Sequence, residues 1–455
     1  MNRLLLLSFA MTTLFWAGCQ SRPGTVTNQL HSNNQSKQTG AARSVLDPCQ
    51  LIQAPHSGDT RSDREIIRLQ QSLPTARDAV PVIERLGWMF IGKARTSFDP
   101  GFFKLAEQCA ACLDARKTGS AEALLLRGHV LQNLHHFKEA ERVARQLVTQ
   151  RGLPFDFGLL GDVLMELGRL TEAIDAYQKM VDMKPDAQAY ARVAHIRWLT
   201  GDLPGAVEVM RMAASACSPQ AAEGAAWIYS RLAFYEWLAG EREAANQSCA
   251  TALQLQMDYP PALLLRGRIR LADGQSAEAV EPLLRAARLN PLPEYQWTLA
   301  EALRAAGRTV EAEEVEAWLL KTGAIDDPRT FALFLATRGQ RADEAIVLAE
   351  REFNERADVH THDALAWALA AGGRWAEAEA HARKAVAEGT EDARLQLHAG
   401  IIAAKMGRTK EAGKLLSQAA QRRQMLLPSE RAQLESARRE LSALNPAPRT
   451  ALAAH

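Results

Sequence analysis

The chain has 455 residues, with 54 basic and 53 acidic side chains and a formal net charge of +1. No long block of one charge sign stands out, which argues against nucleic acid as a partner, because phosphate binding depends on clustered lysine and arginine. Hydrophobic residues make up 47% of the chain and aromatic residues only 6%, a balance typical of alanine-rich helix packing.

The N-terminus predicts an export signal. Arg3 precedes an apolar run over residues 4–18, which is shorter than the about 20 residues that a membrane-spanning helix needs. The run ends in "AGC" at Cys19, which resembles the lipobox of bacterial lipoproteins, although Trp16 departs from the usual leucine. We therefore expect a signal peptide over 1–18 and a palmitate-type lipid anchor on Cys19, in a periplasmic protein or a membrane-anchored lipoprotein of the cell envelope. Simple cleavage or an uncleaved anchor is the alternative.

A polar segment follows the signal. Residues 19–44 are poor in large apolar side chains and rich in Ser, Asn, Gln and Thr, so they bury too little surface to offset the entropy of chain ordering. We expect a flexible tether there, followed by a helical lead-in over 45–81.

The stretch "LGRLTEAIDAYQKMVDMKP" at 167–185 predicts one helix of a hairpin. Its large apolar side chains recur every three or four residues, at Leu170, Ile174, Tyr177 and Val181. That spacing puts them on one helix face. Gly168 suits the left-handed residue after a helix, and Pro185 stops the next helix. Upstream, Gly161 is small enough to let the partner helix approach closely.

The hairpin recurs with a fixed period. Glycines stand at the predicted turns Gly168, Gly201, Gly240, Gly274, Gly307, Gly339, Gly373 and Gly407, which by subtraction are 33, 39, 34, 33, 32, 34 and 34 residues apart. Seven of the eight are followed five residues later by alanine, and Ala345 comes six residues after Gly339. Alanine fits because the two helices of a hairpin cross most closely there. The interval of 39 predicts a loop or a lengthened helix near "SACSPQAAEGAAW".

These residues resemble a known repeat family. The residues that match the tetratricopeptide repeat pattern are Gly161, Gly168, Ala173, Tyr177 and Pro185, and again Gly267, Gly274, Ala279, Ala286 and Pro291. A further copy spans 121–153, with His135 in the place of the turn glycine, and a weaker copy spans 82–117. The resemblance, which extends to exported tetratricopeptide lipoproteins of bacteria, implies an all-α fold.

The implied fold is an α-α superhelix of about nine to ten hairpins over 82–427. Residues 428–445 carry a helix start signal and an apolar face, so we expect a capping helix that covers the last repeat. Residues 446–455 are expected to form a disordered tail.

Five cysteines remain when Cys19 is set aside. Cys109 and Cys112 lie three residues apart on a predicted helix, without a second CxxC motif or a thioredoxin-like strand. Small core residues are therefore favoured over a redox or metal pair. A disulfide in an oxidising compartment is a further alternative, whose pairing the sequence does not give.

No catalytic signature is present, since GxxxxGK[ST], HExxH, GxSxG and a strand-borne GxGxxG are all missing. We predict no enzyme activity, no catalytic residue, no metal and no cofactor. The pairs His135/His136 and His360/His362 are favoured as surface or capping histidines. The enzyme alternative is a metal or redox centre at the cysteine pair or at His360, His362 and Asp363.

In repeats of this family the first helix of each hairpin lines the concave side, at its second, fifth, ninth and twelfth positions when the turn glycine is the fifteenth. Those positions hold, besides Glu301, the residues Phe155, His195, Trp198, Trp227, Phe234, Trp237, Arg268, Trp297, Arg304, Arg329 and Trp367. Aromatic anchors with arginine at the rim are typical of recognition surfaces, so we expect a ligand groove. The alternative is that these aromatics are oversized core residues. The Asn and Lys set that binds EEVD-like tails is not matched.

We therefore predict a non-enzymatic protein-protein interaction scaffold of the bacterial cell envelope, which binds a peptide or a partner protein in the concave groove. The alternative is a lipoprotein that guides a glycan during polysaccharide export or assembly, because aromatic faces stack on sugar rings. The expected partners are protein or peptide, with a glycan as the alternative, membrane contact through the lipid anchor, and no nucleic acid.

Overall fold

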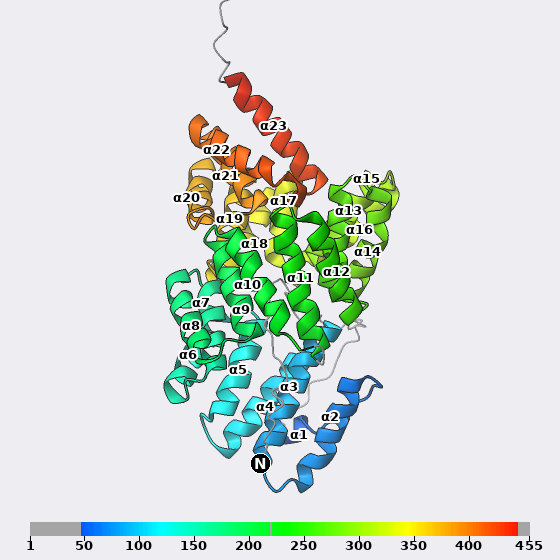
Figure 1. The fold of residues 1–455 in the computed structure, drawn as a ribbon, viewed down its shortest axis with the longest axis vertical. Helices are drawn as coiled ribbons and strands as arrows, with labels where there is room; N and C mark the ends of the chain where they lie inside the picture. Colours follow the sequence, from blue (N-terminus) through cyan, green and yellow to red (C-terminus); the bar gives the residue numbers. More distant parts are fainter. Residues whose placement is uncertain (1–46, 219–220, 445–455) are drawn as a thin grey trace, which may run out of the picture. The chain divides into compact units, whose positions relative to one another are not determined.

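A computed structural model describes residues 47–218 and 221–444, and within these ranges every regular element is a helix (Figure 1). The expected signal peptide, the expected lipidation site at Cys19 and the whole expected tether over 19–44 lie outside the described residues, as does the chain after 444. The described chain forms two compact units, over 47–151 and 152–444. No helix in either unit is both long and apolar enough to cross a membrane.

The unit over 47–151 begins with short helices and continues with two hairpins. Its elements are α1 (Pro48–Leu51), α2 (Arg61–Ser72), the 3-10 helix η1 (Leu73–Thr75), α3 (Val80–Ser97), α4 (Gly101–Arg116), α5 (Ala121–Asn133) and α6 (Phe137–Gln150). The apolar core of this unit includes Ile66, Phe90 and Cys109, all fully buried. The first helices of its two hairpins, α3 and α5, contact each other.

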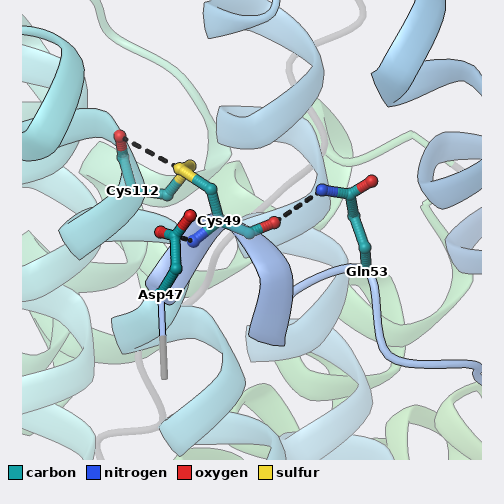
Figure 2. The surroundings of a disulfide bond; sticks show 4 residues. All are labelled: Asp47, Cys49, Gln53 and Cys112. Carbon is teal, nitrogen blue, oxygen red and sulfur yellow. Dashed lines mark hydrogen bonds between the residues drawn. A yellow bond between two sulfur atoms is a disulfide. The ribbon is translucent and has the colours of Figure 1, made fainter. Parts of the chain in front are cut away.

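Cys112 is part of a disulfide. Figure 2 shows the bond between Cys49 of α1 and Cys112 of α4, which joins residues 63 apart in the sequence. The prediction of small core residues is correct for both cysteines, which are 0% exposed; Cys109 is free, and Cys112 also forms the disulfide that was the further alternative. Sequence spacing missed the bond because the partner, Cys49, lies on a separate four-residue helix.

The unit over 152–444 consists of eight consecutive hairpins and a final helix. Its helices are α7 (Pro154–Glu166), α8 (Leu170–Met183), α9 (Ala187–Leu199), α10 (Leu203–Ala216), α11 (Ala222–Leu238), α12 (Arg242–Leu255), α13 (Pro260–Ala272), α14 (Ser276–Leu289), α15 (Pro293–Ala305), α16 (Thr309–Asp326), α17 (Pro328–Arg338), α18 (Ala342–Glu355), α19 (Val359–Ala371), α20 (Trp375–Ala385), α21 (Ala393–Lys405), α22 (Thr409–Gln421), the 3-10 helix η2 (Arg423–Met425) and α23 (Pro428–Leu444). From α11 onward the first helices of successive hairpins, the odd-numbered ones, pack against one another. The fold is all-α, an α-α superhelix of helical hairpins, with α23 against the last one.

The predicted turns are confirmed. All eight turn glycines have positive φ angles, between 62° and 84°, the left-handed region that glycine adopts without steric cost. His135, which replaces the glycine in the copy at 121–153, also has a positive φ of 62°. The alanines that follow the eight glycines are all 0% exposed. They lie where the paired helices approach most closely.

Two helices differ from the expected pattern. Ile174 was expected on the buried face of α8 but is exposed, because the face that packs against α7 is made of Ala173, Ala176, Tyr177 and Met180. The longer period before Gly240 corresponds to a longer first helix: α11 has 17 residues, whereas α9 has 13.

Candidate functional site

The expected groove residues all lie on first helices of the 152–444 unit. They are Phe155 on α7, His195 and Trp198 on α9, Trp227, Phe234 and Trp237 on α11, Arg268 on α13, Trp297 and Arg304 on α15, Arg329 on α17 and Trp367 on α19. The sequence register therefore assigned them to a single kind of helix, the first of each hairpin.

Their side chains do not line an open groove. The five tryptophans of the set are 0% (Trp198), 4% (Trp227), 4% (Trp237), 1% (Trp297) and 7% (Trp367) exposed. Phe155, Phe234, Arg268 and Arg304 are half-buried. The aromatic rings are therefore interior side chains in this structure, as the alternative interpretation proposed, and their role in ligand binding stays a prediction.

Hairpins distant in the sequence cover these rings. The amide of Ala357 donates to the carbonyl of Glu166 (3.0 Å), and the Thr390 hydroxyl donates to the carbonyl of Leu199 (2.7 Å). The end of α7 thus contacts the segment that leads into α19, and the end of α9 contacts the segment that leads into α21. In both cases the two hairpins are six apart in the sequence. In the same way the end of α11 contacts the segment that leads into α23, through the Gln424 side chain and the Trp237 carbonyl (3.3 Å).

One group of aromatic residues surrounds Trp198. The indole N–H donates to the carbonyl of Glu391 (3.3 Å), and the ring stacks near His360 at a centroid distance of 5.7 Å. His195 lies 3.1 Å from the Tyr235 hydroxyl through Nδ1. Burial, together with nearby cationic groups, lowers the pKa of His195 well below its usual range, so the ring is neutral near pH 7.

Buried charges lie beside this group. Arg329 reaches Asp358 (3.0 Å) and the Thr361 hydroxyl (2.9 Å), while Arg356 reaches Glu166 (3.5 Å). Burial and the neighbouring carboxylate of Asp358 raise the pKa of Glu166. The Arg356–Glu166 pair joins the same distant hairpins as the hydrogen bonds above, whereas Arg329 and Asp358 join the neighbouring helices α17 and α19. Buried charges that are paired in this way hold their helices in one arrangement.

The second group, which we call the Trp297 cluster, consists of Trp237, Arg268, Trp297, Glu301 and Arg394. Arg268 lies over the Trp237 ring (5.8 Å), and Arg394 lies over the Trp297 ring (5.1 Å). The Trp297 indole N–H donates to Glu301 (3.2 Å). Burial raises the pKa of the Glu301 carboxyl. The cluster thus places two cations and one acceptor on the inner face, where Arg268 also pairs with Glu294 of α15 (3.3 Å).

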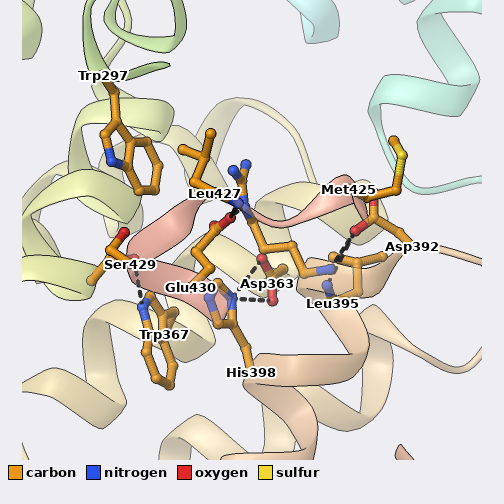
Figure 3. Close-up of polar contacts among 12 residues, drawn as sticks. Trp297, Asp363, Trp367, Asp392, Leu395, His398, Met425, Leu427, Ser429 and Glu430 are labelled. Carbon is orange, nitrogen blue, oxygen red and sulfur yellow. Dashed lines mark hydrogen bonds and ion pairs between the residues drawn. The ribbon is translucent and has the colours of Figure 1, made fainter. Parts of the chain in front are cut away.

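The chain itself occupies this cluster. Figure 3 shows Leu427, Ser429 and Glu430, at the start of α23, among Trp297, Trp367 and His398. Arg394, at the second position of α21, occupies one of the repeat positions that predict groove residues. It was not among the expected residues because the selection favoured aromatic side chains. Glu430 lies beyond the array, so no repeat position pointed to it.

The remaining expected residues have local partners. The Trp367 indole donates to the Thr337 hydroxyl (3.0 Å), and its ring stacks on His398 at 4.1 Å. Arg304 makes a two-point ion pair with Glu316 on the following helix (3.1 and 2.6 Å). Within the described residues, neither Trp367 nor Arg304 forms a hydrogen bond with the chain segment that fills the Trp297 cluster.

The geometry does not support the metal or redox alternative. Residues 47–218 and 221–444 contain no group of three or more side chains placed to hold a metal ion. His362 lies against His381 (2.9 Å between Nδ1 atoms), Asp363 pairs with His398 (3.0 Å), and His360 stacks near Trp198. Burial raises the pKa of the Cys109 thiol, which makes it a poor nucleophile.

Comparisons with known proteins agree with the repeat pattern. Residues 125–188, 159–222 and 264–325 match the family described as tetratricopeptide repeat. These segments are therefore similar to tetratricopeptide repeats. Among curated proteins no match was found. A crystal structure of yeast Tom70 aligns at 13% identity over 84% of this chain and 93% of its own length, with a TM-score of 0.37. A crystal structure of MamA aligns at 18% identity over 36% of this chain and 93% of its own length, with a TM-score of 0.29.

Proposed function

We propose that this chain is a non-enzymatic protein-protein interaction scaffold, which binds a peptide or partner protein on the inner face of the 152–444 unit. The observation that carries the proposal is the Trp297 cluster, whose side chains hold a polypeptide segment through its backbone as well as its side chains. Packed helices present these groups in fixed positions, so little conformational entropy is lost when a ligand binds.

We place the scaffold in the bacterial cell envelope. The signal-like run over 1–18 and the lipobox-like Cys19 support export. The disulfide between Cys49 and Cys112 is a second support, because disulfides persist in oxidising compartments outside the cytosol. Metabolic labelling with palmitate tests the anchor: the wild-type chain should carry the label, and the Cys19→Ser variant should not.

A peptide ligand has more support than a glycan. Stacking on sugar requires open ring faces, whereas every tryptophan of the expected groove is less than 8% exposed. The polar groups around those rings instead meet backbone carbonyl and amide groups, as Arg268 and Glu301 do. The inner face therefore fits a polypeptide better than a polysaccharide.

The experiment is affinity capture of envelope proteins by the purified full chain. We expect the double variant Arg268→Ala/Arg394→Ala to recover its main partner at least about tenfold less well than wild type. The reason is that an arginine anchor often contributes about 2 kcal/mol or more to an interface. The matched control is Arg308→Ala/Arg374→Ala, which removes two exposed arginines of the same unit. Circular dichroism checks the fold of both. Equal recovery by the inner-face variant and the control, with both folded, would exclude the inner face as the binding surface.

A further inference from the structure

Residues 424–430, which we call the crossing segment, connect α22 to α23 and lie on the Trp297 cluster. Arg268 donates to the carbonyl of Met425 (2.6 Å). Glu301 accepts from both the backbone amide (3.1 Å) and the hydroxyl (2.5 Å) of Ser429. These contacts join positions 128 to 157 residues apart in the sequence. The segment therefore lies against hairpins far from its own.

The contacts have the form of peptide recognition. Two of them read the backbone, at the Met425 carbonyl, which ends η2, and at the Ser429 amide in the first turn of α23, and helix ends leave such groups without an intrahelical partner. The side chains of Met425, Leu426 and Leu427 are buried against the inner face. At the end of the segment Glu430, fully buried, pairs with Arg394 (2.5 Å). The order of groups is thus aliphatic side chains, a hydroxyl and then a carboxylate (Figure 3).

The helix that follows has its buried side chains at its beginning, and further along Glu440 pairs with Lys405 of α21 (3.6 Å) and Leu441 lies near Gly413 of α22. Glu430 and Leu434 are the buried residues of α23 over 428–443, and all residues from 435 to 443 are half-buried or exposed. Gln433 adds one hydrogen bond to the Thr337 carbonyl (3.0 Å). Release of the crossing segment would therefore expose few apolar groups of α23, but would leave Arg268, Glu301 and Arg394 without these partners.

We propose that the Trp297 cluster is a peptide-acceptor site that the chain occupies with its own crossing segment. The partner segment that fits it is a polypeptide with two or three large aliphatic side chains followed, three to four residues later, by a carboxylate in the first turn of a helix. Such a segment competes with residues 424–430 for the same groups, so α23 must leave when the partner binds. This proposal rests on the proposed function and adds the chemistry of the ligand and its regulation.

The test measures binding of a fluorescent peptide with the sequence of residues 422–431, RRQMLLPSER, to the full chain by anisotropy. In the chain variant Glu430→Lys the crossing segment is repelled by Arg394, so we expect the peptide to bind at least tenfold more tightly than to wild type. The control Glu435→Lys makes the same charge change at an exposed residue of α23 and should behave as wild type. A peptide with lysine in place of the glutamate should not bind.

A milder variant covers the case in which Glu430→Lys fails to fold. Ser429→Ala removes one hydrogen bond to Glu301 and should tighten peptide binding about threefold, a smaller gain because the amide contact remains. The proposal is overturned when a folded variant of either kind binds the peptide no better than wild type, or when no chain binds it at all. It is equally overturned when the lysine peptide binds as well as the original.

The two proposals fail in different ways. Tight peptide binding by Glu430→Lys, together with partner capture that does not depend on Arg268 and Arg394, supports the acceptor site and removes the proposed function. Partner capture that depends on those arginines but is not inhibited by excess RRQMLLPSER peptide supports the scaffold and removes the acceptor site. Hydrogen exchange on the wild-type chain gives an independent readout, because excess peptide should speed exchange over 431–444 in α23.

Discussion

Asp162 holds two side chains from different helices at the centre of the hairpin formed by α7 and α8. It accepts from the Tyr177 hydroxyl (2.8 Å) and makes a two-point ion pair with Arg192 of α9 (2.8 and 2.7 Å). Asp162 and Arg192 are 0% and 4% exposed. The Tyr177 ring lies directly over Gly161, where a Cβ atom would come within 2.4 Å of it. The small glycine therefore lets the hydroxyl reach Asp162.

Asp162→Asn should destabilise the 152–444 unit by about 3–5 kcal/mol, because it leaves the buried guanidinium of Arg192 without a counter-charge. Tyr177→Phe removes only one hydrogen bond and should cost about 1 kcal/mol. Urea denaturation followed by circular dichroism measures both free energies of unfolding. Equal losses in the two variants would mean that the ion pair contributes little beyond the hydrogen bond.

The sequence predicted part of this arrangement. Gly161 and Tyr177 follow from the repeat pattern, because their spacing recurs in other copies. Asp162 and Arg192 do not, since a single charged residue within a helix is usually on its solvated face. Pairing across two hairpins depends on how one hairpin is placed on the next, and no periodicity in the sequence reports that placement.

At the scale of elements, α1 depends on its disulfide. The helix has four residues, none of them fully buried, and its cap is an Asp47 side chain that accepts from the Cys49 amide (2.9 Å). The bond to Cys112 closes a loop of 63 residues, for which the chain-entropy argument gives about 4 kcal/mol of stabilisation.

Cys49→Ser should therefore lower the free energy of unfolding of the 47–151 unit by about 2–4 kcal/mol, and the wild-type chain in reducing agent should behave like the variant. Limited proteolysis should cut near residues 47–60 in the variant first. Cys217→Ser, a half-buried free cysteine of the other unit, is the control. A wild-type chain whose unfolding is insensitive to reducing agent would contradict the expected role of the bond.

Most elements were predictable because their signals are local. Each hairpin of the 152–444 unit carries its own turn glycine and its own small alanine, and these alone locate the helices, as in α13 and α14 around Gly274. The longer α11 was anticipated from one interval that exceeds the others. The disulfide partner was not, because Cys49 lies before the repeats and has no fixed spacing to any of them.

At the scale of the 152–444 unit, the decisive feature is the contact between hairpins six apart. Trp198 shows its effect: the register places the ring on the inner face, but the Glu391 carbonyl and the His360 ring close that face. Exposure of an inner face depends on how far the superhelix rises in each turn. That rise is the sum of small rotations between neighbouring hairpins, so it cannot be derived from the pattern of any one repeat.

Turn glycines offer a direct test of these distant contacts. Gly168 and Gly274 have almost the same backbone conformation, with φ of 72° and 78°. A Cβ atom at Gly168 would lie 2.3 Å from the Ala357 carbonyl oxygen, whereas at Gly274 it would meet nothing within 4 Å. Both substitutions by alanine therefore carry the same left-handed strain, about 1–2 kcal/mol, and only Gly168→Ala also disturbs the contact between α7 and the segment before α19.

We expect Gly168→Ala to cost about 1 kcal/mol or more beyond Gly274→Ala, because the carbonyl must move and the hydrogen bond from the Ala357 amide to Glu166 weakens. Urea denaturation gives the difference between the two free energies. Hydrogen exchange gives its location, since the amide of Ala357 should exchange faster in Gly168→Ala and as in wild type in Gly274→Ala. Identical stability and identical exchange in the two variants would mean that hairpins six apart do not support one another, and that each repeat is stabilised by its neighbours alone.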